Sequence, residues 1–143
     1  MARFDTPISN DWQRLLDAAA AARANAHAPY SHYSVGAALE CDDGSIVAGC
    51  NVENATYGAT VCAERNAIGH AIATGRRRFV ACVVITPGER PAPPCGICRQ
   101  VLSEFANDLP ILLVSESGTR TLVQLAQIFP GSFGADFLAE SKR

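Results

Sequence analysis

The chain has 143 residues, a formal net charge of −2, 48% hydrophobic residues and 18% charged residues. This length suits one domain, predicted over residues 1–143, and the apolar fraction excludes a chain that is disordered by default. The charge gives no general electrostatic reason to bind nucleic acid or an anionic membrane, so neither is expected as a partner. The basic run at 76–78 is interpreted as a solvated helix end.

The N-terminal segment and the longest apolar run argue against secretion and membrane insertion. Residues 1–12 contain two aspartates and no continuous apolar stretch, unlike a secretory signal. The longest apolar run, FVACVVI at 79–85, is far shorter than the ~20 residues that cross a bilayer. We therefore expect a soluble, cytoplasmic protein, in which six cysteines indicate burial or metal binding more than disulfides.

The first half of the chain predicts a helix followed by a β-hairpin. Apolar residues at helical spacing predict a helix from Ser9 or Asn10 to about Ala24. Pro29 places residues 27–34 in a loop. The turn Asp42-Asp43-Gly44 lies between two apolar runs, which is typical of a hairpin.

The second half continues with alternating helices and strands. Residues 86–94 contain four prolines and cannot form regular structure. The other expected elements are a helix from about 62 to 75, a strand over 79–85, a helix from about 95 to 107, a strand over 110–115, a helix over 121–127 capped by Thr121, and a compact, aromatic, irregular tail over 129–138. This order predicts a layered α/β domain, and the hairpin makes its sheet mixed.

Three cysteines lie at predicted helix starts. Cys95 and Cys98 form Cys-Gly-Ile-Cys directly after a proline pair, and Cys62 opens the preceding helix. A Cys-x2-Cys pair allows both sulfurs to reach one ion at ~2.3 Å. The unpaired N–H groups of a helix start also favour the thiolate form, which is the form that binds metal.

Several interpretations of these cysteines compete: buried inert thiols, a thioredoxin-like redox pair, or a structural zinc site. A structural zinc site normally has four protein ligands, and the local motifs offer three cysteines and no histidine. Three ligands favour a catalytic site with an open fourth position. The remaining cysteines, Cys41, Cys50 and Cys82, are interpreted as core or strand residues, and none of His27, His32 and His70 is assigned to the metal.

Glu64 favours the catalytic interpretation. It follows Cys62 by two residues in the same first helical turn, where it can lie beside the ion without binding it. Zinc lowers the pKa of water, and a neighbouring carboxylate can carry the proton. A redox disulfide or a structural zinc site has no use for this carboxylate. Cys-x-Glu followed by Pro-Cys-x-x-Cys is the signature of zinc deaminases.

The sequence resembles the small cytidine deaminases with three cysteine ligands, from about Trp12 to Leu138. The matching stretches are PYSHYSVGAAL, GCNVENATYG, CAERNAI, PPCGICRQVL and FPGSFG. The resemblance implies a three-layer α/β/α fold, a free nucleoside as substrate and a homotetramer. It also implies hydrolytic deamination of cytidine and 2′-deoxycytidine to the uridines and ammonia, in pyrimidine salvage.

The resemblance also implies the roles of the reacting groups. Cys62, Cys95 and Cys98 would hold Zn²⁺. Glu64 would take a proton from water, deliver it to N3 of the pyrimidine and assist the loss of ammonia after attack at C4. The backbone N–H of Ala63 would contact O2 of the base.

Further residues would bind the nucleoside. Asn51 and Glu53 alternate onto one face after the hairpin and match the positions that bind the sugar in the family. Without the resemblance, the residue types alone would favour an asparagine that stabilises a turn and a glutamate exposed to solvent. Tyr33 stands where the family usually has a phenylalanine that packs on the base, and its hydroxyl is a departure. Phe133 matches an aromatic residue that reaches into a neighbour's pocket, its alternative being a local core anchor for the tail.

Arg65 is expected to compensate charge. Three thiolates exceed the two charges of Zn²⁺, which weakens the ion as a Lewis acid. A guanidinium that hydrogen-bonds the sulfurs would withdraw this excess. The alternative is a surface salt bridge.

Three other functions compete with this one. A deaminase for a modified cytosine nucleoside, such as blasticidin S, is the close alternative. Editing of nucleic acid would need basic or aromatic surface for flanking nucleotides, which the composition does not favour. A zinc-stabilised binding module would leave Glu64 without a role.

Overall fold

The structure is a computed structural model that describes residues 2–3 and 10–141. Its strands are β1 (Ala2–Arg3), β2 (Gly36–Cys41), β3 (Ile46–Cys50), β4 (Phe79–Thr86), β5 (Pro110–Ser115) and β6 (Arg120–Gln124). Its helices are α1 (Asn10–Arg23), α2 (Ala63–Ala73), α3 (Gly96–Phe105), α4 (Leu125–Ile128) and α5 (Ala135–Glu140), with a 3-10 turn η1 at Tyr57–Ala59. None of the described helices has the length and apolar character to cross a membrane.

The strands form one mixed sheet in the order β1-β6-β5-β4-β2-β3. Strands β4 and β5 are parallel, and the other neighbours are antiparallel. The hairpin of β2 and β3 has the register Ala38↔Ala48. Gly44 in its turn has φ +83°, a conformation that glycine adopts without strain. The predicted hairpin and mixed sheet are therefore confirmed.

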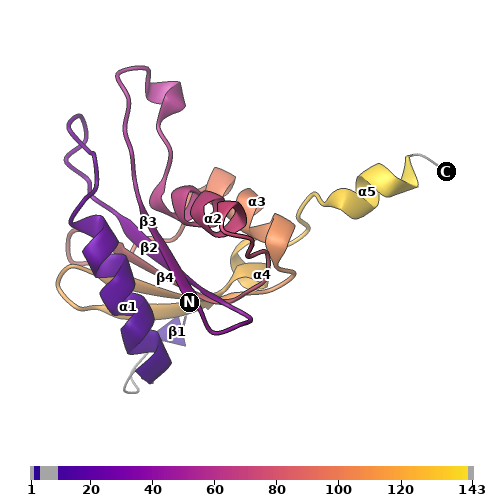
Figure 1. The fold of residues 1–143 in the computed structure, drawn as a ribbon, viewed down its shortest axis with the longest axis horizontal. Helices are drawn as coiled ribbons and strands as arrows, with labels where there is room; N and C mark the ends of the chain where they lie inside the picture. The colour runs from indigo at the N-terminus through magenta and orange to yellow at the C-terminus, as the bar shows by residue number, and fades with distance from the viewer. Residues whose placement is uncertain (1, 4–9, 142–143) are drawn as a thin grey trace.

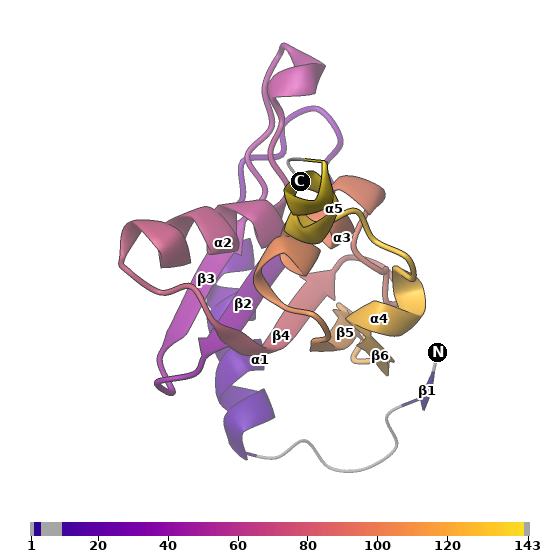
Figure 2. The same cartoon turned by 90° about the vertical axis from the view of Figure 1, so that its right-hand side faces the viewer.

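Helices cover both faces of the sheet, as Figures 1 and 2 show. Leu15 and Ala19 of α1 pack on one face against Ala38, Val83 and Leu112. The other face carries α2 and α3, where the core includes the buried residues Leu39, Ala67, Ala71, Val84, Leu102, Ile111 and Leu113. The predicted three-layer α/β/α fold is confirmed.

Two glycines let the helices approach the hairpin closely. A Cβ at Gly49 would lie 2.4 Å from the backbone nitrogen of Ala67 in α2, and one at Gly36 would lie 1.9 Å from the carbonyl oxygen of Ala19 in α1. Real Cβ atoms do not make such contacts, so any larger residue would displace the helices. The start of α2 is thus held firmly over β3.

The predicted elements of the middle of the chain agree with the structure to within two residues at their ends. Gly75, with φ +86°, follows α2. In the basic run, Arg77 and Arg78 are exposed as expected, whereas Arg76 donates from Nε to Oγ of Ser45 at 2.6 Å. The proposed cap Ser9 lies outside the described residues.

The predicted helix over 121–127 is wrong. Residues Arg120–Gln124 form β6, which pairs with β5 at Leu112↔Leu122, and only Leu125–Ile128 are helical. Gly118, with φ +94°, lies in the turn between the two strands. The open edge of β5 offers hydrogen-bond partners to this segment, and that long-range pairing overrides its mixed local propensity.

The prediction of a compact, irregular tail over 129–138 is only partly right: residues 129–134 form no helix or strand, but the rest of the tail differs. Residues 135–140 form α5, which projects away from the body of the molecule (Figure 1). Phe133, Phe137 and Leu138 are each more than half exposed. Phe133 and Phe137 stack on each other at 5.7 Å instead of entering the core.

Candidate active site

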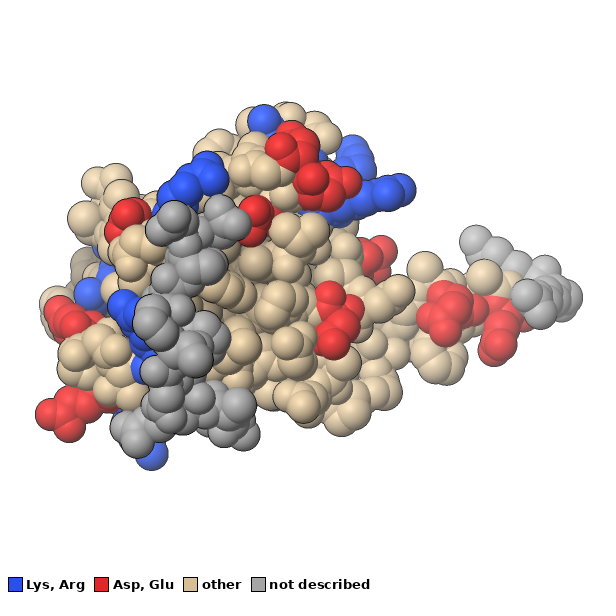
Figure 3. All heavy atoms as spheres, turned by 90° about the horizontal axis from the view of Figure 1, so that it is seen from below, with Lys and Arg blue, Asp and Glu red and all other residues tan. Residues whose placement is uncertain are grey.

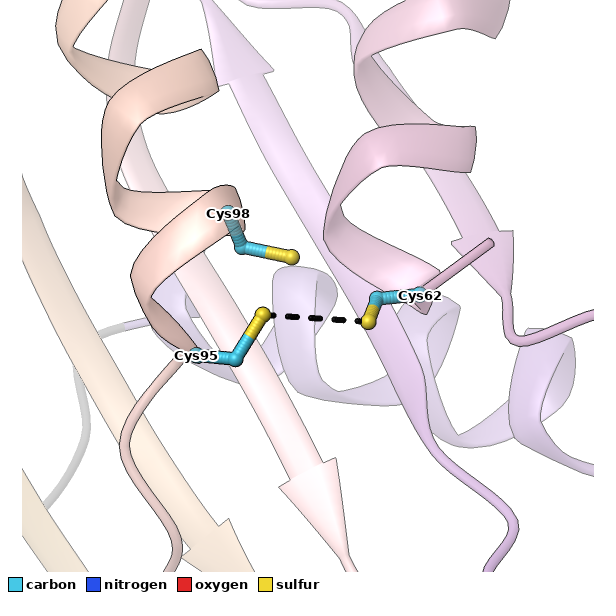
Figure 4. Close-up of side chains that lie close together, drawn as sticks. All are labelled: Cys62, Cys95 and Cys98. Carbon is cyan, nitrogen blue, oxygen red and sulfur yellow. Dashed lines mark hydrogen bonds between the residues drawn. The ribbon is translucent and has the colours of Figure 1, made fainter. Parts of the chain in front are cut away.

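The starts of α2 and α3 bring three cysteines together. Cys62 and Cys95 are the extended residues that precede these helices, and Cys98 lies in the first turn of α3. Their sulfurs all lie within 4.8 Å of one another, and Figure 4 shows the side chains pointing toward a common point. The predicted convergence of the two helix starts is therefore present.

The geometry and chemistry of this cluster suit zinc. The sulfurs of Cys62 and Cys95 are 3.9 Å apart. Two Zn–S bonds of ~2.3 Å at a tetrahedral angle place their sulfurs about 3.8 Å apart. All three cysteines are free thiols. Three sulfurs leave one tetrahedral position open, which is the arrangement of a catalytic zinc site.

Hydrogen bonds to Cys62 favour its thiolate. Hydrogen bonding from the Cys98 thiol is the main cause that lowers the pKa of Cys62 to about 5, and Arg65 and Cys95 contribute to the same shift. The same interaction raises the pKa of Cys98, which remains the proton donor.

Arg65 contacts this thiolate directly. Its Nη2 donates to the sulfur of Cys62 at 3.6 Å, and its Nε is buried without a hydrogen-bond partner among the described residues. The guanidinium therefore lies against the ligand cluster. Among the described residues it forms no salt bridge with a carboxylate, which is the arrangement that the alternative required.

Glu64 lies at the inner end of a pocket and is 5% exposed. Burial raises the pKa of its carboxyl, and the charge of Cys62 raises it further. It belongs to the first turn of α2, directly after Ala63, which is fully buried. A buried carboxyl with a raised pKa is suited to exchange protons near neutral pH.

The pocket has a volume of about 560 Å³, within the range of small-molecule sites. Its lining includes the predicted residues Tyr33, Asn51, Glu53, Cys62, Ala63, Glu64 and Cys95. Residues that the sequence interpretation missed also line it, namely Ser31, Val35, Thr60, Val84, Thr86, Ala92 and Pro93. Two of these residues lie on one face of β4, because side chains alternate along a strand and Val84 and Thr86 therefore share a face with Cys82.

Asn51 is buried and holds the loop before β2. Its Oδ1 accepts from the backbone N–H of Val35 at 2.9 Å, and its Nδ2 donates to the carbonyl of Tyr33 at 2.7 Å. One N–H and one lone pair of the amide stay available on a side chain that lines the pocket. Asn51 is therefore not a local turn residue: it binds a loop that is distant in sequence, and it also lines the pocket.

Glu53 is held by the tip of the same loop. Its carboxylate accepts from the backbone N–H groups of Tyr30 and Ser31 at 2.9 and 3.1 Å, and from the hydroxyl of Ser31. The Ser31 hydroxyl is the main reason that the pKa of Glu53 is lowered, with the two backbone donors adding to it. The carboxylate is therefore fixed in its charged form at the outer end of the pocket.

The two aromatic candidates differ in position. Tyr33 lines the pocket and is 42% exposed. Phe133 does not line the pocket of its own chain and is 56% exposed, which contradicts the local core anchor. Cys41 and Cys82 are buried in the core as expected.

Comparison with known proteins agrees with this geometry. A family model described as the cytidine and deoxycytidylate deaminase zinc-binding region matches residues 9–112. The cytidine deaminase of Halalkalibacterium halodurans is 44% identical over 127 residues, which are 88% of this chain and 96% of that protein. A blasticidin-S deaminase of Bacillus cereus is 29% identical over 106 residues, 68% of this chain and 75% of that protein.

A solved structure gives the same result. The crystal structure of cytidine deaminase from Burkholderia pseudomallei matches with a TM-score of 0.82 and 41% identity, over 88% of this chain and 100% of that one. The three-layer fold, the cysteine cluster and the buried glutamate define a deaminase with a zinc-binding region. The chain belongs to the cytidine deaminase family, whose members are hydrolases that act on the C–N bond of a cyclic amidine.

Proposed function

We propose that this protein converts free cytidine and 2′-deoxycytidine to uridine and 2′-deoxyuridine with release of ammonia, in pyrimidine salvage. The observation that carries the proposal is the position of Glu64. It is buried at the inner end of a pocket of nucleoside size, in the same helical turn that follows Cys62.

In this proposal Cys62, Cys95 and Cys98 hold Zn²⁺, with Arg65 donating to the Cys62 sulfur. The ion would lower the pKa of a water molecule and so make it a nucleophile at neutral pH. The guanidinium offsets the negative charge of three thiolates.

Glu64 carries the protons of the reaction. It takes one proton from the attacking water and delivers it to N3 of the pyrimidine, while the water oxygen forms a bond to C4. It then transfers the second proton of that water to the amino nitrogen, the C4–N bond breaks, and ammonia leaves. The raised pKa of Glu64, caused first by its burial, suits both directions of transfer.

Other residues orient the nucleoside. The backbone N–H of Ala63 lies at the start of α2, where helices leave N–H groups unpaired, and is assigned to O2 of the base. The free amide valences of Asn51 and the fixed carboxylate of Glu53 are assigned to the sugar hydroxyls. Tyr33 is assigned to the face of the base.

The charges around the pocket favour an unphosphorylated substrate. No Lys or Arg occurs among the described residues that line it, and the outer end carries the charged Glu53. A phosphate there would be repelled and unpaired. On the face drawn in Figure 3, acidic and basic side chains of the described residues are interspersed over the body, and the projecting arm shows acidic ones only, which supports a small-molecule substrate over nucleic acid.

The projecting tail supports an assembly of copies. Phe133, Phe137 and Leu138 are exposed on an arm that extends from the body, and large exposed apolar groups mark interaction surfaces. We propose a homotetramer in which Phe133 enters the pocket of a neighbour.

We also propose that the protein is cytoplasmic, because six free cysteines persist in a reducing compartment. We further propose that residues 1–143 form one domain, since β1 at one end of the chain pairs with β6 near the other.

The test combines metal analysis and turnover on one purified sample. Zinc content is measured by mass spectrometry, and conversion of cytidine, 2′-deoxycytidine and cytidine 5′-monophosphate is followed by ultraviolet absorbance. The proposal expects turnover of the two nucleosides and little or none of the nucleotide. Absence of cytidine turnover in a zinc-replete sample would refute it.

A modified cytosine nucleoside is the second candidate. A hollow of about 400 Å³ adjoins the outer end of the pocket, shares Ser31, Glu53 and Thr60 with it, and is lined by Tyr30 and Tyr57. It leaves room for a substituent on the sugar, as in blasticidin S. Turnover of blasticidin S with a higher kcat/KM than cytidine would favour this candidate.

A further inference from the structure

Helix α3 connects the ligand cluster to the C-terminal segment. The two residues after Cys98, Arg99 and Gln100, are half-buried and point to backbone carbonyls outside their own helix. We call this pair the α3 anchor. Neither residue lines the pocket or belongs to the cysteine cluster.

Arg99 joins two segments that are distant in sequence. Its Nε donates at 2.8 Å to the carbonyl of Pro94, the residue before Cys95. Its Nη1 donates at 2.7 Å to the carbonyl of Ile128, the last residue of α4. The final carbonyls of a helix lack intrahelical partners, and charged donors make the stronger hydrogen bonds. Arg99 thus fixes the end of α4 relative to the turn that carries Cys95.

Gln100 fixes the next part of the tail. Its Nε2 donates at 2.9 Å to the carbonyl of Phe133. Phe133 itself is exposed, and the chain then continues into α5, which extends from the body (Figure 1). The hydrogen bond therefore holds the backbone of Phe133 at the point where the tail leaves the body, and it directs the aromatic side chain outward.

We infer that Gln100 is a positioning residue for Phe133 in the reaction of a neighbouring subunit, and that Arg99 ties this position to the zinc-ligand turn. The inference rests on the proposed function, in which Phe133 completes a neighbour's pocket. In each subunit, helix α3, which carries Cys98, would thereby fix the position of the Phe133 side chain that enters the pocket of the next subunit. The expected consequence is an effect on KM without loss of metal.

The test compares Gln100→Ala, Gln100→Glu, Phe133→Ala and the double variant Gln100→Ala/Phe133→Ala as full-length, zinc-loaded protein. Gln100→Glu keeps the shape of the side chain and replaces its donor by an acceptor. Gln127→Ala is the matched control, because Gln127 is an exposed glutamine on α4. Zinc content, assembly by light scattering, cytidine kinetics and amide hydrogen exchange at 131–141 are measured for each.

Both Gln100 variants should raise KM roughly threefold to tenfold, the range of one hydrogen bond, with a smaller change in kcat. Both should keep their zinc and their assembly, and exchange at 131–141 should become faster. The double variant should have the KM of Phe133→Ala alone, because the two residues act through one contact. Gln127→Ala should match the unaltered protein in every measurement.

Different failures have different meanings. If Phe133→Ala raises KM but Gln100→Ala does not, or if the two effects add, the positioning role is wrong while the proposed function stands. Unaltered behaviour of Gln100→Glu, or dissociation of the Gln100 variants, would also overturn it. If Phe133→Ala leaves KM unchanged, the proposed place of Phe133 in a neighbour's pocket is itself wrong, and the inference falls with it.

Discussion

The two ends of the pocket are built in different ways. At the inner end, Cys62, Glu64 and Cys95 lie at the starts of α2 and α3, and both helices pack on the sheet. At the outer end, Asn51 and Glu53 lie in the segment after β3, which is held by hydrogen bonds to the loop before β2. Figure 2 shows these two connecting segments extending beyond the layers.

This difference separates chemistry from recognition. Proton transfer and metal binding require atoms fixed within a fraction of an ångström, which packed helix starts supply. Recognition of a sugar tolerates adjustment, which loops held by hydrogen bonds allow. We therefore expect changes at the inner end to affect metal content and kcat, and changes at the outer end to affect KM.

The largest effect is expected from Cys98→Ala. Losing one of three sulfurs should remove most of the bound zinc and with it the activity. Zinc per chain, measured by mass spectrometry after dialysis, checks this. Cys50→Ala is the control. Cys50 lies outside the cluster, so this variant should keep its zinc. Retention of zinc by Cys98→Ala would contradict the ligand set.

Glu64→Gln should separate catalysis from metal binding. The amide cannot carry a proton, so kcat should fall roughly 10²- to 10⁴-fold while zinc content and the circular dichroism spectrum stay unchanged. Glu104→Gln, at an exposed position of α3, is the control and should be fully active. Activity within tenfold of the unaltered protein would show that another group moves the protons.

Arg65→Ala should have a smaller effect at the same end. Loss of the donor to Cys62 should reduce zinc affinity or kcat about 10- to 100-fold, while the fold is retained. Zinc competition with a chelator and steady-state kinetics measure the two quantities. Arg77→Ala, on the exposed surface, should change neither. Unchanged metal affinity and turnover in Arg65→Ala would remove this role.

The smallest effect is expected at the outer end, from Ser31→Ala. The Ser31 hydroxyl is the main group that lowers the pKa of Glu53, so the carboxylate stays charged to lower pH than usual. The stabilisation that comes from the charged Glu53 carboxylate is present at pH values above its pKa in the unfolded chain. It is lost as the pH falls through the pKa of Glu53 in the folded protein. When the Ser31 hydroxyl is removed, the pKa of Glu53 should rise toward 4.5.

The measurement is KM for cytidine against pH. In Ser31→Ala, KM should begin to rise at higher pH than in the unaltered protein, with a rise of about twofold to fivefold at neutral pH from the lost hydrogen bond. The kcat should change little. Ser45→Ala, in the hairpin turn, is the control. A fall in kcat equal to the rise in KM would contradict the separation of the two ends.

Local signals explain why much of the fold was predictable. The Asp42-Asp43-Gly44 turn, the proline pair before Cys95 and the glycine after α2 each act locally: proline fixes φ, and glycine permits the positive φ that a tight turn or a helix end needs. Strand β6 could not be predicted in this way, because its pairing with the edge of β5 depends on partners distant in sequence. The same holds for the tail, whose aromatic residues are apolar yet face outward.

The sequence alone determined the chemistry of the inner end. Cysteine and glutamate spacing is local, so residues 62–64 and 95–98 predict a metal-binding deaminase site without coordinates. Only the tertiary structure decided how the two halves meet, because sulfurs within 4.8 Å require both helices to pack on one sheet. It also decided that Asn51 and Glu53 hold a loop, and that Arg99 and Gln100 hold the tail, since hydrogen bonds to distant backbone carbonyls and N–H groups leave no pattern in a sequence.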